Sequence, residues 1–178
     1  MNEKVLVAYA STYGSTQEVA EAIAATLRDS GLEVDFQPMR KVQSLVGYGA
    51  AVLGAPLFMM RWHKDALRFL AQHREALSEQ PVAVFALGPF HDEEKEWQGV
   101  RAQLDKELAK FPWLTPAAKQ IFGAKFDPEK LRFPWNLVPA LKQMPASDIR
   151  DWAAIRAWAD SLRPLLLQQG QKNPEKVQ

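Results

Sequence analysis

The 178-residue chain contains no cysteine, which excludes disulfide bonds, thiol redox chemistry and cysteine-ligated iron–sulfur clusters. Its three histidines, His63, His73 and His91, are widely spaced and form no metal-ligand motif. Any redox role would therefore need an organic cofactor.

The sequence also lacks an uninterrupted apolar run long enough for a transmembrane helix. Residues 1–4 lead directly into an apolar stretch and leave no room for a signal peptide, so we expect a cytoplasmic protein. There are 22 Lys and Arg against 21 Asp and Glu, and no basic stripe that would indicate nucleic acid as a partner. The length suits one domain with its own core.

One stretch, VLVAYASTYGST at Val5–Thr16, organises the rest of the chain. Its apolar start is typical of a strand covered on both faces, and a helical pattern follows it directly. Between them, Gly14 lies among the hydroxyl side chains of Ser11, Thr12, Ser15 and Thr16. Free N–H groups at the start of a helix favour a phosphate, whereas the simpler interpretation is a hydroxyl N-cap. With no Lys or Arg in residues 5–16, neutral donors would hold the phosphate.

Hydrophobic periodicity predicts alternating strands and helices. Strands are expected at 5–8, 32–37, 50–54, 81–87 and within 117–126, and helices at 17–30, 63–77, 93–110 and 148–167, the last with Ser147 as its N-cap. A short helix is expected within 38–46, and residues 168–178 are expected to be a disordered tail. This alternation predicts an α/β fold in which helices cover both faces of a parallel sheet.

Three unusual loops follow the first, third and fourth predicted strands, so they should meet at the carboxyl edge of the sheet. The second loop contains Ala55, Pro56, Leu57, Phe58, Met59, Met60 and Trp62, and the third contains Leu87, Gly88, Pro89, Phe90 and His91. These mostly apolar residues would enclose a flat ring system, while the hydroxyl loop would bind a phosphate. Flavin mononucleotide (FMN) fits best, because the sequence contains no motif that would bind a second phosphate or a metal.

The pattern Ser11-Thr12-x-Gly14-x-Thr16 resembles the phosphate loop of flavodoxins, and the resemblance spans roughly residues 4–167. It implies a flavodoxin-like three-layer αβα sandwich with a five-stranded parallel sheet in the order 2-1-3-4-5. It also implies that FMN is held by residues of the three loops, namely Ser11, Thr12, Tyr13, Gly14, Ser15, Thr16, Ala55, Pro56, Leu57, Phe58, Met59, Met60, Leu87, Gly88, Pro89, Phe90 and His91.

Within that family the chain is most similar to the menaquinone-dependent protoporphyrinogen IX dehydrogenase type, which carries an extra segment before the last helix. Here that insertion would be residues 127–145. The resemblance implies an FMN-dependent oxidoreductase that oxidises protoporphyrinogen IX with a quinone acceptor. The alternatives are a non-enzymatic flavodoxin-type electron carrier, against which the near-neutral charge counts, and an interaction module that has lost FMN.

Individual residues near the expected site have two interpretations each. Phe58, Trp62 and Phe90 either stack on a ring or pack beneath a loop, and Arg61 either steadies an anion or is solvated. His63 and His91 either pass protons or have no such role. The insertion is either a lid or membrane-surface element, with Lys130, Arg132 and Lys142 near lipid headgroups, or a packing or dimer element that buries Phe133 and Trp135.

Overall fold

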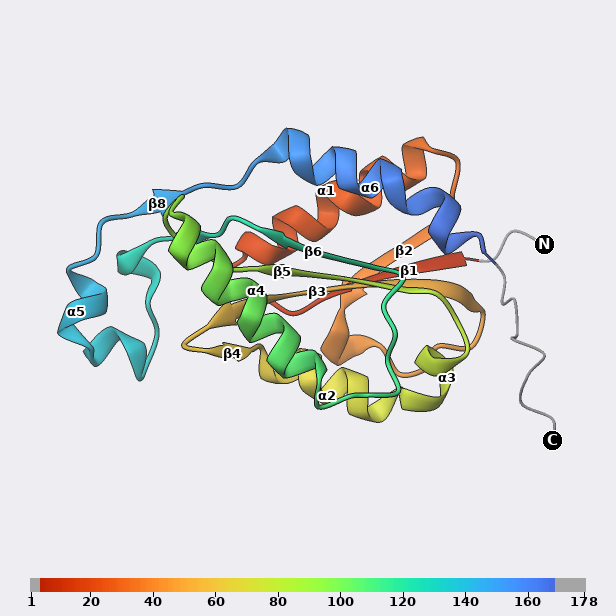
Figure 1. Ribbon diagram of the computed structural model, residues 1–178, viewed down its shortest axis with the longest axis horizontal. Helices are drawn as coiled ribbons and strands as arrows, with labels where there is room; N and C mark the ends of the chain where they lie inside the picture. The colour runs from red at the N-terminus through yellow and green to blue at the C-terminus, as the bar shows by residue number, and fades with distance from the viewer. Residues whose placement is uncertain (1–3, 169–178) are drawn as a thin grey trace.

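The computed structural model describes residues 4–168, so all but the first residue of the expected tail lies outside the described part (Figure 1). Its main sheet has the strand order β2-β1-β3-β5-β6, and these five strands are parallel. They are β1 (Lys4–Tyr9), β2 (Val34–Pro38), β3 (Tyr48–Phe58), β5 (Val82–Leu87) and β6 (Ala118–Phe122). The predicted order of the parallel strands is confirmed, since the additional β4 is a short antiparallel strand.

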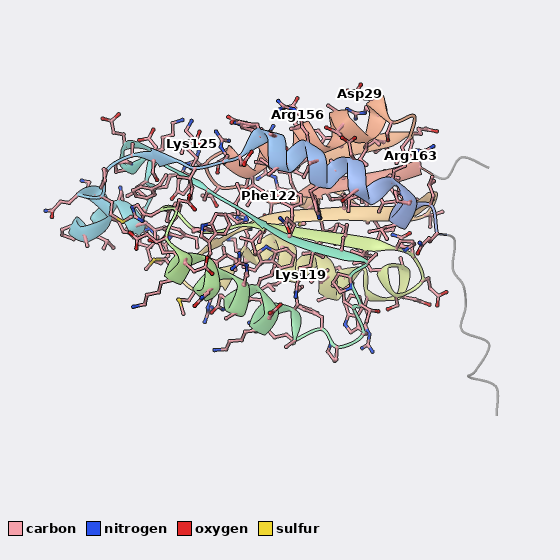
Figure 2. The ribbon with its side chains drawn as sticks, turned by 45° about the horizontal axis from the view of Figure 1, so that its top comes forward. Asp29, Lys119, Phe122, Lys125, Arg156 and Arg163 are labelled. Atoms are coloured by element: carbon pink, nitrogen blue, oxygen red, sulfur yellow. The ribbon has the colours of Figure 1, made fainter. Side chains whose placement is uncertain are left out.

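Helices cover both faces of the sheet, as Figure 1 shows. One face packs against α1 (Ser15–Asp29) and α6 (Trp152–Leu166), and the other against α2 (Lys64–Gln72), α3 (Arg74–Ser78) and α4 (Glu94–Leu108). Successive residues of β1 alternate between the two cores, as strand geometry requires: Val5 and Val7 face one, Leu6 and Ala8 the other. Phe122 lies under α6 (Figure 2). The centre of its ring is 5.6 Å from that of the Trp158 ring.

The prediction of a loop at residues 55–62 is wrong, because this segment forms a β-hairpin. Strand β3 continues to Phe58, turns through Met59 and Met60, and returns antiparallel as β4 (Arg61–Trp62). Both methionines have positive φ, 50° and 67°, as the two-residue turns that match strand twist require. The indole N–H of buried Trp62 donates to the Ala55 carbonyl at 3.0 Å, which fastens the returning strand.

Three further helix predictions differ from the structure. The helix expected over 63–77 is divided at His73 into α2 and α3, and the helix expected within 38–46 is only a 3₁₀ turn, η1 (Met39–Lys41). The last helix begins after Asp151, whose carboxylate accepts a hydrogen bond from the Ala154 N–H at 3.0 Å. Ser147 is therefore not its N-cap but belongs to a strand.

The insertion leaves and rejoins the fold through a pair of antiparallel strands, β7 (Lys125–Phe126) and β8 (Ser147–Asp148). Between them lie η2 (Pro128–Lys130), η3 (Trp135–Leu137) and α5 (Pro139–Lys142). Figure 1 places this segment at one end of the molecule, beyond the carboxyl ends of the parallel strands. No described helix is long and apolar enough to cross a membrane.

Candidate functional site

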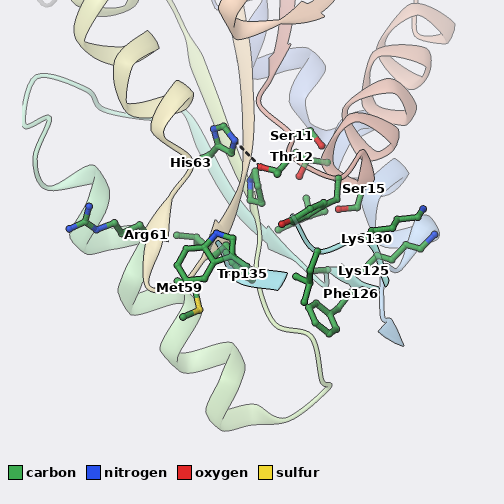
Figure 3. A pocket seen from close by; sticks show the side chains of 18 of the residues that line it. Ser11, Thr12, Ser15, Met59, Arg61, His63, Lys125, Phe126, Lys130 and Trp135 are labelled. Carbon is green, nitrogen blue, oxygen red and sulfur yellow. Dashed lines mark hydrogen bonds between the residues drawn. The ribbon is translucent and has the colours of Figure 1, made fainter. Parts of the chain in front are cut away.

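A cavity of about 670 Å³ lies at the carboxyl ends of β1, β3 and β5 (Figure 3). This volume is in the range of small-molecule and cofactor pockets. Eleven of the seventeen predicted site residues line it: Ser11, Thr12, Tyr13, Ser15, Thr16, Pro56, Leu57, Phe58, Met59, Leu87 and Phe90. The three segments that contain them are therefore brought together at one place, as the chain order predicts.

The hydroxyl loop does not cap α1 in the ordinary way. The N-cap residue is Gly14, which has φ 90° and makes no side-chain capping bond. Instead, Ser11 Oγ accepts a hydrogen bond from the Gly14 N–H at 2.9 Å and closes the loop just before the helix. The N-cap interpretation of the hydroxyls is thus not what the structure shows, and the first turn of α1 opens beside the cavity.

Thr16 carries the clearest sign of a ligand-binding site. Its side chain is fully buried, yet Thr16 Oγ1 has no hydrogen-bond partner among the described residues. A buried hydroxyl without a partner costs free energy, so such groups are rare and each needs an explanation. Because Thr16 lines the cavity within the first turn of α1, where the helix dipole favours negative charge, the site fits a phosphate.

Aromatic side chains form the other part of the cavity. Phe58 lies with its ring centre 6.3 Å from that of Phe90 and 5.3 Å from that of Trp135, both in edge-to-face arrangements. The walls they provide suit a planar apolar ring. Trp135 belongs to the insertion, which was expected either to be a lid or membrane-surface element or to pack and bury this residue. The aromatic and proline residues of the insertion do not reveal from sequence alone which ring faces the cavity.

Six predicted site residues do not line the cavity: Gly14, Ala55, Met60, Gly88, Pro89 and His91. Ala55 and Pro89 are buried, and Met60 is 75% exposed at the hairpin turn. A side chain at Gly88 would meet Val100, so this glycine permits close packing of α4. His91 Nδ1 lies 2.7 Å from Glu96 Oε1 and pairs with α4 instead.

The insertion and the preceding strand β7 form one wall of the cavity with residues that the sequence did not single out as site residues, among them Lys125, Phe126, Lys130, Leu131 and Trp135. The backbone N–H of Arg132 donates to the Tyr13 hydroxyl at 3.4 Å, which connects this wall to the hydroxyl loop. Phe133 is 77% exposed, so the expectation that packing would bury it is wrong, whereas Trp135 is partly buried.

His63 joins two of the three loops. Its Nε2 lies 3.1 Å from Thr12 Oγ1, and its Nδ1 accepts a hydrogen bond from the Asp65 N–H at 3.1 Å (Figure 3). Burial lowers the pKa of the His63 imidazole below its ordinary value. Arg61, on the same hairpin, points away from the cavity centre and is exposed.

Arg150 fastens the insertion to the helix that begins at the site. Its side chain is only 4% exposed, and it donates to Asp148 Oδ2 at 2.8 Å and to Glu18 Oε2 at 2.7 Å. The guanidinium also lies 4.8 Å from the centre of the Trp152 ring. Its hydrogen bonds lower the pKa of Asp148. A single arginine before a helix gives no sequence signal of such a role.

Comparison with known proteins agrees with this geometry. The chain is 23% identical over 134 residues to protoporphyrinogen IX dehydrogenase [quinone] of Escherichia coli strain K12. The aligned region covers 74% of this chain and 71% of that protein. Oxidised flavodoxin 1 of Bacillus cereus has a TM-score of 0.59 at 17% identity, covering 90% of this chain and 97% of that one. Flavodoxin 2 of the same species has a TM-score of 0.58 at 22% identity, covering 90% and 98%. The flavodoxin domain family model matches residues 6–136, and the chain therefore belongs to this family.

Proposed function

We propose that the chain binds FMN in the cavity and acts as an FMN-dependent oxidoreductase. The buried Thr16 hydroxyl without a partner, at the start of α1, carries the proposal, because it marks where an anion would be held. Ser11, Thr12, Ser15 and Thr16 with the N–H groups of α1 would bind the phosphate, and Phe58 and Phe90 would flank the ring. Bound FMN supplies reversible electron and hydride transfer, while the protein binds it, orients it and excludes water.

The substrate we propose is protoporphyrinogen IX and the acceptor a quinone, since the similar Escherichia coli enzyme is named for both compounds. This substrate is an apolar macrocycle that carries carboxylate groups. The cavity offers apolar walls together with the cationic side chains of Lys125 and Lys130. A flavodoxin-type electron carrier is the competing function, and the near-neutral net charge of +1 gives such a carrier little electrostatic docking surface.

Ligand binding tests the cofactor first. The purified chain, freed of any bound flavin, is titrated with FMN and with riboflavin while flavin fluorescence is recorded. We expect FMN to bind at least about tenfold more tightly, since charge-assisted hydrogen bonds to the phosphate are lost with riboflavin. Equal affinities would contradict a phosphate site at α1.

Turnover then separates the enzyme from the carrier. We expect the FMN-loaded chain to oxidise protoporphyrinogen IX when a menaquinone analogue is present, with porphyrin fluorescence as the readout. A chain that binds FMN but is never reduced by this substrate would be a carrier, or an enzyme for another substrate.

The cavity end of the molecule also has features of a membrane-surface element, and we include this contact in the proposal. The exposed apolar side chains of this end are Met59, Met60, Phe133 and Leu137. Basic side chains accompany them on the hairpin and the insertion: Arg61, Lys130, Arg132 and Lys142. Exposed apolar groups flanked by cations suit the surface of an anionic bilayer.

A further inference from the structure

His63 and Thr12 are 51 residues apart in the chain but meet at the wall of the cavity. His63 follows β4 and is the N-cap of α2, while Thr12 belongs to the hydroxyl loop. Figure 3 shows the hydrogen bond between His63 Nε2 and Thr12 Oγ1, 3.1 Å long. The His63 side chain is mostly buried, whereas Thr12 is exposed to the cavity side, so a ligand can reach the threonine.

The direction of this hydrogen bond follows from the other ring nitrogen. His63 Nδ1 accepts from the Asp65 N–H, and a nitrogen that accepts carries no proton. A neutral imidazole has one ring proton, which must then be on Nε2. Nε2 therefore donates to Thr12 Oγ1. The hydroxyl oxygen is thus occupied as an acceptor, and the Thr12 hydroxyl proton is left to donate elsewhere.

We propose that His63 is a positioning residue that turns the Thr12 hydroxyl into a hydrogen-bond donor for a phosphate monoester at the start of α1. This inference rests on the proposed function, in which FMN is the ligand. The loop has no Lys or Arg in residues 5–16, so its affinity for a phosphate depends on neutral donors that already point the right way. A freely rotating hydroxyl would have to be ordered when the ligand binds, and His63 removes that cost beforehand.

The two hydrogen bonds of His63 can be separated by substitution. His63→Asn keeps a good N-cap acceptor for the Asp65 N–H, but its side chain is too short to reach Thr12. His63→Gln is long enough to place an amide N–H near Thr12. If His63 only caps α2, the asparagine variant should behave as the wild type does in every assay.

Affinity for FMN and riboflavin, measured by calorimetry at pH 8, is the test. We expect His63→Asn to bind FMN about tenfold more weakly, with riboflavin binding unchanged and His63→Gln restoring most of the loss. The double variant with Thr12→Val should bind no more weakly than Thr12→Val alone. The proposal is overturned if His63→Asn binds FMN as the wild type does, or weakens FMN and riboflavin equally.

A second measurement does not depend on flavin. Nitrogen-15 spectra of the ligand-free chain should show His63 protonated at Nε2 and not at Nδ1, and the opposite tautomer would overturn the proposal. If the wild type binds no FMN, the proposed cofactor fails, and titration with ribose 5-phosphate then decides the inference by itself. Binding of ribose 5-phosphate that weakens in His63→Asn supports it; no binding, or equal binding, overturns it.

Discussion

At the scale of single residues, we expect the hydroxyl of Thr16 to have opposite effects on the stability of the fold and on ligand binding. Thr16→Val keeps the side-chain shape and removes a buried oxygen that has no partner. Removing that unsatisfied group should raise the free energy of unfolding of the ligand-free chain by about 1 kcal/mol, measured in urea. The same change should weaken FMN binding at least about tenfold, because it deletes a donor to a charged group.

Thr26→Val is the matched control, since Thr26 lies on the same helix and its hydroxyl donates to the Ala22 carbonyl at 2.9 Å. It should leave FMN affinity unchanged and should not stabilise the chain. A destabilised Thr16→Val variant would mean that the hydroxyl contributes to the ligand-free fold. The sequence identifies four hydroxyls in this loop as equivalent candidates. Thr16 lies three and four residues before Val19 and Ala20 on the apolar stripe of α1, so helix periodicity predicts its burial. That its buried hydroxyl has no hydrogen-bond partner depends on the surrounding packing, and no local pattern contains that information.

The contact between His63 and Thr12 shows the same limit. Each residue is visible as a candidate in the sequence, one as a phosphate donor and one as a proton carrier. Their hydrogen bond depends on where β4 returns along β3, and the hairpin that fixes this position was not predicted. The glycine of the loop was easier to identify, because its left-handed φ of 90° is a local requirement of the turn.

At the scale of elements, the hairpin of β3 and β4 escaped prediction for a physical reason. Its turn residues, Met59 and Met60, have positive φ, a conformation that usually requires Gly, Asn or Asp. Burial of Trp62 and its hydrogen bond to Ala55 compensate for that strain. A pattern search that relies on turn residues therefore finds only an apolar loop there.

The buried Arg150 is expected to stabilise the fold by connecting β8 to α1. Arg150→Met leaves Asp148 and Glu18 without their cation and frees β8 from the first turn of α1. We expect the free energy of unfolding at pH 7 to fall by about 2 kcal/mol, less than for a fully buried pair because both carboxylates are partly exposed. Urea unfolding followed by far-UV circular dichroism measures it.

Arg101→Met is the control, since Arg101 also lies over an indole and pairs with Glu94 but is well exposed. We therefore expect its free energy of unfolding to change by no more than about 0.5 kcal/mol.

The pH dependence of the stabilisation by Arg150 has a definite sign. Arg150 lowers the pKa of Asp148 in the folded state, so this stabilisation is present above the unfolded pKa, about 3.9, and is lost as the pH falls through the folded value. The difference in free energy of unfolding between Arg150→Met and the wild type should therefore become smaller below about pH 4. A difference that stays constant with pH would argue against the ion pair.

The insertion is expected to be separable from the flavin fold. Because Phe126 pairs with Ser147 across β7 and β8, residues 127–146 can be replaced by Asn-Gly, the turn that closes a two-residue hairpin. We expect this variant to fold and to bind FMN within a few-fold of the wild type, but to lose oxidation of protoporphyrinogen IX because one wall of the cavity is gone. Flavin titration and the porphyrin assay give the two readouts.

Full turnover by the shortened chain would show that the insertion is not part of the substrate site. Should the shortened chain fail to fold, Trp135→Ala tests the same wall within the full chain. It should weaken substrate use while leaving riboflavin binding within a few-fold, since Trp135 approaches Phe58 only edge to face.

At the scale of the whole molecule, the order of strands and helices along the chain predicted more of the structure than any single motif did. Alternation of strands and helices was enough to predict a parallel sheet covered on both faces and the meeting of three loops at one edge of that sheet. The order of the five strands was predicted from the resemblance to flavodoxins. The insertion was identified from the resemblance to the dehydrogenase type, but its place over the cavity depends on contacts such as the one between Arg132 and Tyr13, 119 residues apart.

The last prediction concerns the surface at the cavity end, where the apolar side chains of the hairpin and the insertion are exposed. We expect the chain to sediment with vesicles that contain phosphatidylglycerol and to bind pure phosphatidylcholine vesicles much more weakly, with binding that decreases as salt rises. Phe133→Ser with Leu137→Ser should lower the partition coefficient about tenfold, because each loses part of the roughly 1.5–3 kcal/mol available from burying a large apolar side chain.

Val46→Ser is the control, since Val46 is 90% exposed but precedes β3 at the opposite end of the sheet, so membrane partition should not change. Partition that is equal for both lipids, or unaffected by the double substitution, would contradict a bilayer contact. Sedimentation velocity without vesicles identifies the competing use of this surface: a dimer that the same double substitution dissociates would assign the exposed side chains to contact between two copies. The two outcomes are distinct because only the bilayer contact requires anionic lipid.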